Sequence, residues 1–162
     1  MFQKEGQIYP ARGRAGQPAS GNPIIAAAGG QDSFRAGKDG VVMARFCWRD
    51  VTNPQLANNT GTGRPLGFVQ NNGTATIERV GDTASMTIRA GTAVTPVVQG
   101  DFFAESTTPV TAGQKVFAVL ADGTIKTDAE GATVADAIET DWYAVENAAA
   151  GEVFTMSTWS RA

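Results

Sequence analysis

The chain has 162 residues, of which 42% are hydrophobic and 18% are charged, and its formal net charge is −3 at neutral pH. This length predicts one globular domain, and the acidic balance argues against a nucleic-acid-binding protein. Because histidine is absent and Cys47 is the single cysteine, the sequence excludes an internal disulfide, a cysteine-based zinc site and the histidine-dependent nucleophile systems.

The start of the chain lacks the apolar core of a signal peptide, and no apolar run approaches the roughly 18 residues of a membrane span. We therefore expect a protein made in a reducing cytoplasm, with no membrane partner, metal or cofactor. Residues 1–50 carry seven Lys or Arg against four Asp or Glu, whereas residues 51–162 carry six against twelve. This polarity suits docking on a charged surface.

Residues 1–40 contain eight glycines and three prolines and few large apolar side chains. This composition predicts an extended N-terminal arm that is either disordered alone or laid along a partner. Two alternatives remain, a terminus without a role and a segment that completes a sheet of its own subunit. The basic residues of this arm are candidates for contact with a partner, namely Lys4, Arg12, Arg14, Arg35 and Lys38.

Residues 41–48 alternate in polarity and predict the first strand of a β-rich body that spans residues 41–162. We interpret Cys47 as a small side chain packed in or beside a sheet rather than as a reactive thiol. Residues 50–65 carry the turn signals of a loop. Further strands are predicted in the segments 66–70, 74–80 and 85–89.

Between residues 90 and 127, short runs rich in Val and Phe are interrupted by Gly, Pro, Asp and Thr. Asp122-Gly123 lies between two such runs and predicts a hairpin with a type I′ turn. Residues 128–141 fit a loop or one short helix, and a closing hairpin is predicted around residues 147–151. About eight short strands then indicate an all-β fold, a small sandwich or barrel that is jelly-roll-like or β-tulip-like.

No group of residues forms a convincing catalytic site. The carboxylates of the segment 128–141 could serve a hydrolase, but we interpret them as a solvated acidic loop; the densest group is Asp136, Glu139 and Asp141, preceded by Asp128 and Glu130. Gly61-Thr62-Gly63-Arg64 lacks the Gly-Lys-[Ser/Thr] ending of a phosphate-binding loop.

Aromatic residues recur on the predicted strands and could form a stacking platform for sugars or bases; these are Trp48, Trp142, Tyr143, Phe154 and Trp159. Packing in the core or at a subunit interface is the preferred interpretation. The candidates for subunit contacts are Phe46, Trp48, Phe102, Phe103 and Trp142.

The order of these segments resembles that of the head-decoration or structural cement proteins of tailed bacteriophages. The resemblance covers most of the chain, from the Gly- and Pro-rich arm through AGKDGVVMARF, PLGFVQ and VTAGQKVFAVLADGTIKT to TDWYAVENAAAGEVFTMSTWS. It implies a non-enzymatic homodimer or homotrimer on the outside of the virion, assembled in the host cytoplasm, which bridges neighbouring major capsid subunits. The alternative function is a glycan-binding adhesin module on a virion or cell surface.

Overall fold

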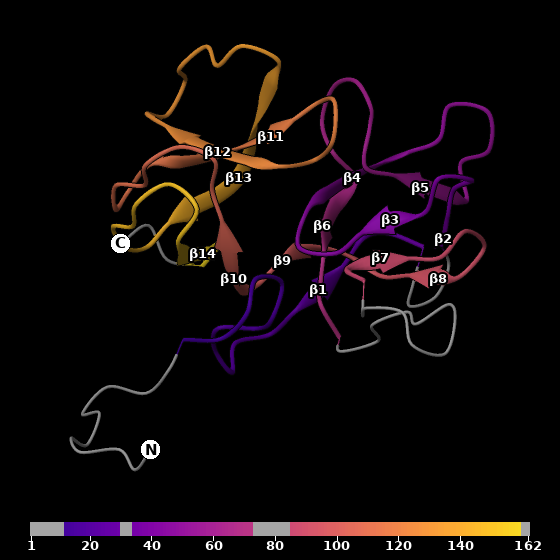
Figure 1. Cartoon of the computed structure of the whole chain (residues 1–162), viewed down its shortest axis with the longest axis horizontal. Helices are drawn as coiled ribbons and strands as arrows, with labels where there is room; N and C mark the ends of the chain where they lie inside the picture. Colours follow the sequence, from indigo (N-terminus) through magenta and orange to yellow (C-terminus); the bar gives the residue numbers. More distant parts are fainter. Residues whose placement is uncertain (1–11, 30–33, 73–84, 160–162) are drawn as a thin grey trace.

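Short strands joined by turns build all of the chain that the computed structural model describes, which comprises residues 12–29, 34–72 and 85–159 (Figure 1). Among these residues there is no helix, and therefore none that could cross a membrane. The strands in chain order are β1 (Ile25–Ala26), β2 (Phe34–Ala36), β3 (Val41–Val42), β4 (Phe46–Arg49), β5 (Leu56–Asn58), β6 (Gly67–Val69), β7 (Thr87–Ile88), β8 (Ala93–Val94), β9 (Pro96–Gln99), β10 (Asp101–Glu105), β11 (Lys115–Val119), β12 (Ile125–Asp128), β13 (Ala137–Ala144) and β14 (Val153–Ser157).

Two large sheets divide the chain between them. The seven-stranded sheet has the order β1-β9-β6-β4-β5-β2-β8, the five-stranded sheet has the order β10-β14-β13-β11-β12, and β3 pairs separately with β7. Nearly all pairs are antiparallel; β2 and β5 are parallel. None of these sheets closes into a barrel within the described part of the chain, so the all-β prediction is confirmed and the sandwich describes the fold better than the barrel.

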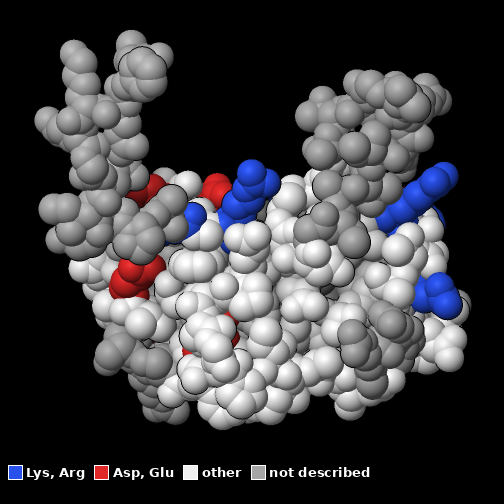
Figure 2. Space-filling view, turned by 90° about the horizontal axis from the view of Figure 1, so that it is seen from below, with Lys and Arg blue, Asp and Glu red and all other residues white. Residues whose placement is uncertain are grey.

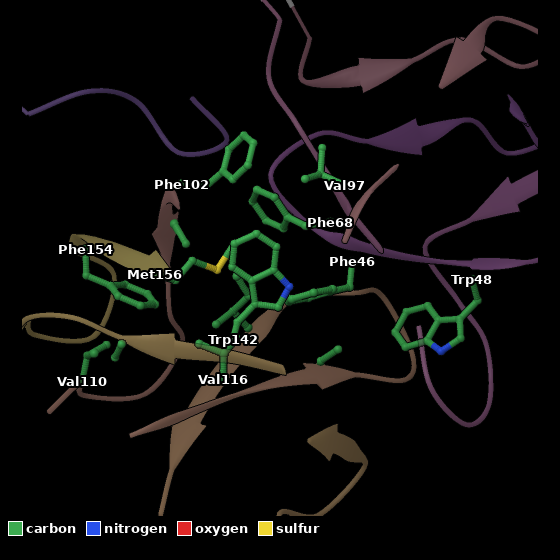
Figure 3. Packing of buried hydrophobic residues seen from close by; sticks show 14 residues of the cluster. Phe46, Trp48, Phe68, Val97, Phe102, Val110, Val116, Trp142, Phe154 and Met156 are labelled. Carbon is green, nitrogen blue, oxygen red and sulfur yellow. The ribbon is translucent and has the colours of Figure 1, made fainter. Parts of the chain in front are cut away.

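The main core lies where the two large sheets meet. The ring of Phe68, from β6, lies 5.5 Å from that of Phe46, 5.6 Å from that of Phe102 and 6.1 Å from that of Trp142. Figure 3 shows these side chains pointing toward one another from strands of both sheets. Aromatic rings at such distances contribute about 0.5–1.5 kcal/mol per pair beyond the area that they bury. This cluster therefore holds the sheets together.

A second core cluster lies within the seven-stranded half. It includes Phe34 and Ala36 from β2 and Cys47 from β4, all of them buried. Burial raises the pKa of the Cys47 thiol to about 12, although a hydrogen bond from the backbone of Gly67 acts in the opposite direction. The interpretation of Cys47 as a small side chain packed in a sheet is confirmed.

The N-terminal segment 12–29 is attached to both sheets. The N–H of Gly16 donates to the carbonyl of Phe103 (2.7 Å), and the N–H of Phe103 donates to the carbonyl of Gln17 (2.9 Å), so the segment first runs along β10. It then forms β1, which pairs with β9. Together with β2, which lies between β5 and β8 in the larger sheet, this arrangement matches the alternative in which the segment completes sheets of its own subunit.

The hairpins predicted late in the chain are present. β11 pairs with β12 across Asp122-Gly123, and β13 pairs with β14. The turn is not type I′, because Gly123 has a positive φ of 71° and Asp122 does not. Segment 129–136 is a loop without a helix, and the strand that follows it begins at Ala137.

Earlier in the chain the agreement is weaker. The strand predicted over residues 41–48 is divided into β3 and β4, because Ala44 has a φ of 60° and breaks the extended conformation. The strand predicted over residues 74–80 lies outside the described residues.

Candidate functional surface

The two ends of the described chain meet at Asp101, directly after the passage from β9 to β10. Its buried carboxylate accepts hydrogen bonds from the Ser20 hydroxyl (2.6 Å) and the Asn22 amide (2.5 Å) of the N-terminal segment. It also accepts a hydrogen bond from the Ser157 hydroxyl at the end of β14. The Ser157 oxygen in turn accepts the N–H of Trp159 (2.9 Å). One carboxylate thus fixes both terminal segments to the crossing between the sheets.

The charge state of Asp101 follows from two opposing causes. Burial raises the pKa of the carboxyl, but the hydrogen bonds from Ser157, Ser20 and Asn22 favour the ionised form and together lower the pKa below its ordinary value. The group is therefore ionised at neutral pH, where it accepts these hydrogen bonds at full strength.

Replacing Asp101 with asparagine is expected to lower the free energy of unfolding at neutral pH by about 1–3 kcal/mol, because charge-assisted hydrogen bonds at a buried site are lost. Since the folded pKa is lowered, this contribution is fully present above the ordinary carboxyl pKa of about 3.9 and is lost as the pH falls through the folded value. Denaturant unfolding at several pH values should show the difference from the unmodified protein shrinking below pH of about 4. The exposed Glu105→Gln is the control, and an equal loss there would contradict the prediction.

An apolar patch lies beside this junction. Ile24, Ile25 and Trp159 are 42%, 43% and 48% exposed, which is unusual for large apolar side chains. The indole N–H of Trp159 donates to the carbonyl of Pro23 (3.3 Å), so Trp159 lies next to the residue that directly precedes Ile24 and Ile25. We call Pro23, Ile24, Ile25 and Trp159 the terminal patch. It has the composition of a contact surface for a partner.

Segment 12–29 runs along the lower side of the molecule in Figure 1 and faces the viewer in Figure 2. Figure 2 shows mainly uncharged residues across the middle of this face, with Lys and Arg at its right-hand end and in the upper centre, and Asp and Glu in the centre and on the left. The face is thus suited to contact through apolar and backbone groups.

The basic residues predicted to contact a partner have different surroundings. Arg12 forms a salt bridge with Glu146 (2.9 Å) and donates to the carbonyl of Val153 (2.8 Å), so it holds the N-terminal segment on its own subunit. Arg14, Arg35 and Lys38 are exposed, and Lys4 lies outside the described residues. The structure does not bring the four described residues together at one site, and the contact of all five with a partner stays a prediction.

The aromatic residues predicted at subunit contacts lie in the core of the subunit. Phe46, Trp48, Phe102 and Trp142 are at most 3% exposed, and Phe103 is half-buried. Four of these five rings therefore offer no surface to a second subunit, and their assignment is corrected. Alternation along a strand identified an apolar face correctly, but it did not show that the apolar faces of two sheets of the same chain cover each other.

The proposed stacking platform is likewise absent from the described surface. Trp48, Trp142, Tyr143 and Phe154 are buried, which leaves Trp159 as the exposed member of that group.

Several carboxylates of the acidic segment are bound by groups of their own subunit. Glu139 accepts the N–H of Gly131 (2.7 Å), and Asp141 forms a salt bridge with Arg64. The hydroxyl of Tyr143 donates to Glu130 (3.1 Å). Across the described ranges, no group of three or more potential metal ligands converges. These carboxylates therefore hold the loop in place or face the solvent.

Sequence reasoning missed both Asp101 and the terminal patch. The adjacent Ile24 and Ile25, directly after Pro23, were the available signal, because two large apolar residues stand out in a Gly- and Pro-rich segment. No local pattern marks Asp101, since its partners are 79 and 81 positions away in the N-terminal segment and 56 positions away at the end of β14.

Over residues 2–158 the chain matches the family described as XM1 gp53 minor capsid protein. The chain belongs to this family. As an XM1 gp53-type minor capsid protein it is a structural component of a phage virion that associates with the capsid and its major capsid protein. The sequence-based recognition of a phage head structural protein is thereby confirmed.

A solved structure described as the capsid of Myoviridae phage XM1 contains a chain with the same fold. The TM-score is 0.62 at 16% sequence identity, and the match covers 97% of this chain and 96% of that chain. A search of curated proteins found no match.

Proposed function

We propose that this minor capsid protein is a decoration, or cement, protein that binds the outside of the phage head and bridges neighbouring major capsid subunits. Such a protein stabilises the shell against the pressure of the packaged DNA. The role requires contact area and rigidity rather than catalysis, and many copies acting together allow modest affinity for each copy. The observation that carries the proposal is the terminal patch on a largely uncharged face.

The geometry of the terminal patch supports a capsid contact. Its side chains are exposed, yet the segments that carry them are fixed by Asp101 and by pairing with β9 and β10. A fixed apolar surface loses little conformational entropy when it binds, so more of the buried area contributes to affinity. Arg14 lies on the same segment and is exposed, so it is available for a polar contact at the rim.

Replacing Ile24 and Ile25 together with aspartate is expected to weaken binding to undecorated capsids at least tenfold. The reason is that charged groups would enter an apolar interface, and buried interface side chains can contribute about 2 kcal/mol or more each. Co-sedimentation of the purified protein with capsids measures the effect. Val51→Asp is the matched control, because Val51 is 99% exposed but lies on the loop between β4 and β5.

Unchanged thermal unfolding must accompany the weaker binding, since both isoleucines are already partly exposed. If Ile24→Asp with Ile25→Asp binds capsids as tightly as Val51→Asp does, the terminal patch is not the capsid contact.

The glycan-binding alternative receives no support from a described aromatic platform, and a saccharide screen with the intact protein tests it directly.

A further inference from the structure

The two parts of the chain on either side of Gly100 carry opposite charge. Before Gly100, the described residues include eight Lys or Arg and two Asp or Glu. From Gly100 to Trp159 there are two Lys and ten Asp or Glu. These parts correspond to the N-terminal segment with the seven-stranded sheet and to the five-stranded sheet, respectively. The subunit is therefore electrically polar along the line that joins its sheets.

Some of these opposite charges form salt bridges that join the two parts within the subunit. The salt bridges between described residues are Arg12–Glu146 (2.9 Å), Arg45–Asp122 (3.7 Å) and Arg64–Asp141. In each of them the cation precedes Gly100 and the anion follows it. Other exposed charges gather at two outer ends of the subunit.

One outer end is basic. Arg35 on β2, Lys38 in the next turn and Arg49 on β4 are exposed, and we call them the basic end. The Arg35 guanidinium donates to the carbonyl of Gly91 (2.9 Å), and that of Arg49 donates to the carbonyl of Ala28 (3.1 Å). None of these three cations forms a salt bridge with another described residue.

The basic end retains positive charge after its neighbours are counted. Asp39 is exposed beside Lys38, and Asp50 follows Arg49. The three cations therefore outnumber the two carboxylates next to them in sequence. The Asp50 carboxylate already accepts hydrogen bonds within its own loop, from the N–H groups of Thr52 (2.8 Å) and Asn53 (2.9 Å).

The opposite outer end is acidic. Asp128 at the end of β12 is exposed, as are Glu130 and Asp136 on the loop that follows, and half-buried Glu139 lies on β13; we call these four residues the acidic end. Lys126 is the nearby cation, and it donates to the carbonyl of Ala135 (3.3 Å). The hydrogen bonds of Glu130 and Glu139 described above hold the loop against the sheet.

The two ends lie far apart on the molecule. In Figure 1, which has the longest axis horizontal, the loop between β12 and β13 lies on the left and β2 lies on the right. Since opposite charges lie at opposite ends, one copy cannot satisfy both within itself.

We propose that the acidic end of one copy binds the basic end of a second copy of this chain, so that subunits associate head to tail. This inference rests on the proposed function, because it describes how copies would contact one another beside their capsid contacts. A head-to-tail contact uses two different surfaces and generates a closed ring or an open row of subunits. Complementary charge sets the orientation and register of such a contact.

The test reverses the charge of each end in a separate variant. In one variant Asp128 and Glu130 are replaced with lysine, and in the other Arg35 and Lys38 are replaced with glutamate. The unmodified protein is expected to self-associate in sedimentation velocity at about 20 mM salt and at least tenfold more weakly at about 500 mM, because salt screens exposed charges. Each variant alone should remain monomeric, and an equimolar mixture of the two should associate again.

Glu105→Lys is the control for a change of net charge away from both ends, and it should associate as the unmodified protein does. Thermal unfolding verifies that every variant is folded. The inference is overturned if the unmodified protein is monomeric at both salt concentrations, if either variant alone associates normally, or if the mixture stays monomeric.

Capsid co-sedimentation with the same proteins separates this inference from the proposed function. If only the head-to-tail contact is wrong, the unmodified protein still binds capsids, and the two variants bind with the same cooperativity as it does. If the proposed function is wrong, no binding to the outside of capsids is seen with any of the proteins. If both proposals are correct, the variants bind with reduced cooperativity.

Discussion

Replacing Gly123 with alanine is expected to lower the free energy of unfolding by about 3–5 kcal/mol, one of the largest effects of a single methyl group in this protein. The Gly123 carbonyl accepts the N–H of Phe46 (2.8 Å), so the turn between β11 and β12 is docked on β4 of the other sheet. A Cβ at position 123 would lie 2.1 Å from the Phe46 carbonyl oxygen. That oxygen is backbone, so the contact can be relieved only by separating the sheets.

Gly63→Ala is the matched control for the backbone conformation. Gly63 has the same positive φ of 71° as Gly123, but a Cβ there meets nothing within 4 Å. The control should therefore cost about 1 kcal/mol, which is the penalty of the left-handed conformation alone. Denaturant unfolding of both variants measures the difference, and equal losses at the two positions would refute the docking explanation.

A protein that begins at Gly37 is expected not to fold cooperatively. The truncation removes β1 and β2, and with them Ala27, Phe34 and Ala36 from the second core cluster. Removal of one buried phenylalanine side chain typically costs 3–5 kcal/mol, and the total stability of a domain is about 5–15 kcal/mol. Loss of β2 also leaves β5 and β8 without the strand that lies between them. Circular dichroism and thermal unfolding would show a broad transition or none.

A protein that begins at Arg12 is the control, since it keeps the complete described segment and its contacts with Glu146 and Asp101. It should unfold with a sharp transition. Should the protein that begins at Gly37 show the same sharp transition, the N-terminal segment is not part of the folded body. In that case the prediction of a separate arm over residues 1–40 would stand.

The parts of the fold that were predicted correctly are those in which partners are close in sequence. The hairpin of β11 and β12 follows from two apolar runs on either side of Asp122-Gly123, and β13 and β14 are joined by a short segment that contains three Ala and one Gly. Turn chemistry and alternation are local, so a single sequence displays them. Even here the turn type was wrong, because docking on Phe46 selected a different backbone conformation.

The N-terminal strands were missed for the opposite reason. β1 pairs with β9, more than 70 positions later, and β2 lies between β5 and β8. Their own residues include few of the β-branched and aromatic types that mark a strand, so tertiary contacts rather than local propensity fix them. The same limitation applies to the candidate surface, because the terminal patch exists only after the two ends of the chain meet at Asp101.

The attachment of segment 12–29 also has a mechanical consequence. Backbone hydrogen bonds in an antiparallel pair lie perpendicular to the strands. A pull along the segment therefore loads its bonds to β10 and β9 simultaneously, as in shear, whereas a pull away from the sheet would break them one after another. Asp101 shares such a force with Ser157 at the end of β14, so tension passes into the five-stranded sheet. In the proposed cement role, how firmly the subunit holds the shell thus depends on the direction of the force as well as on the number of contacts.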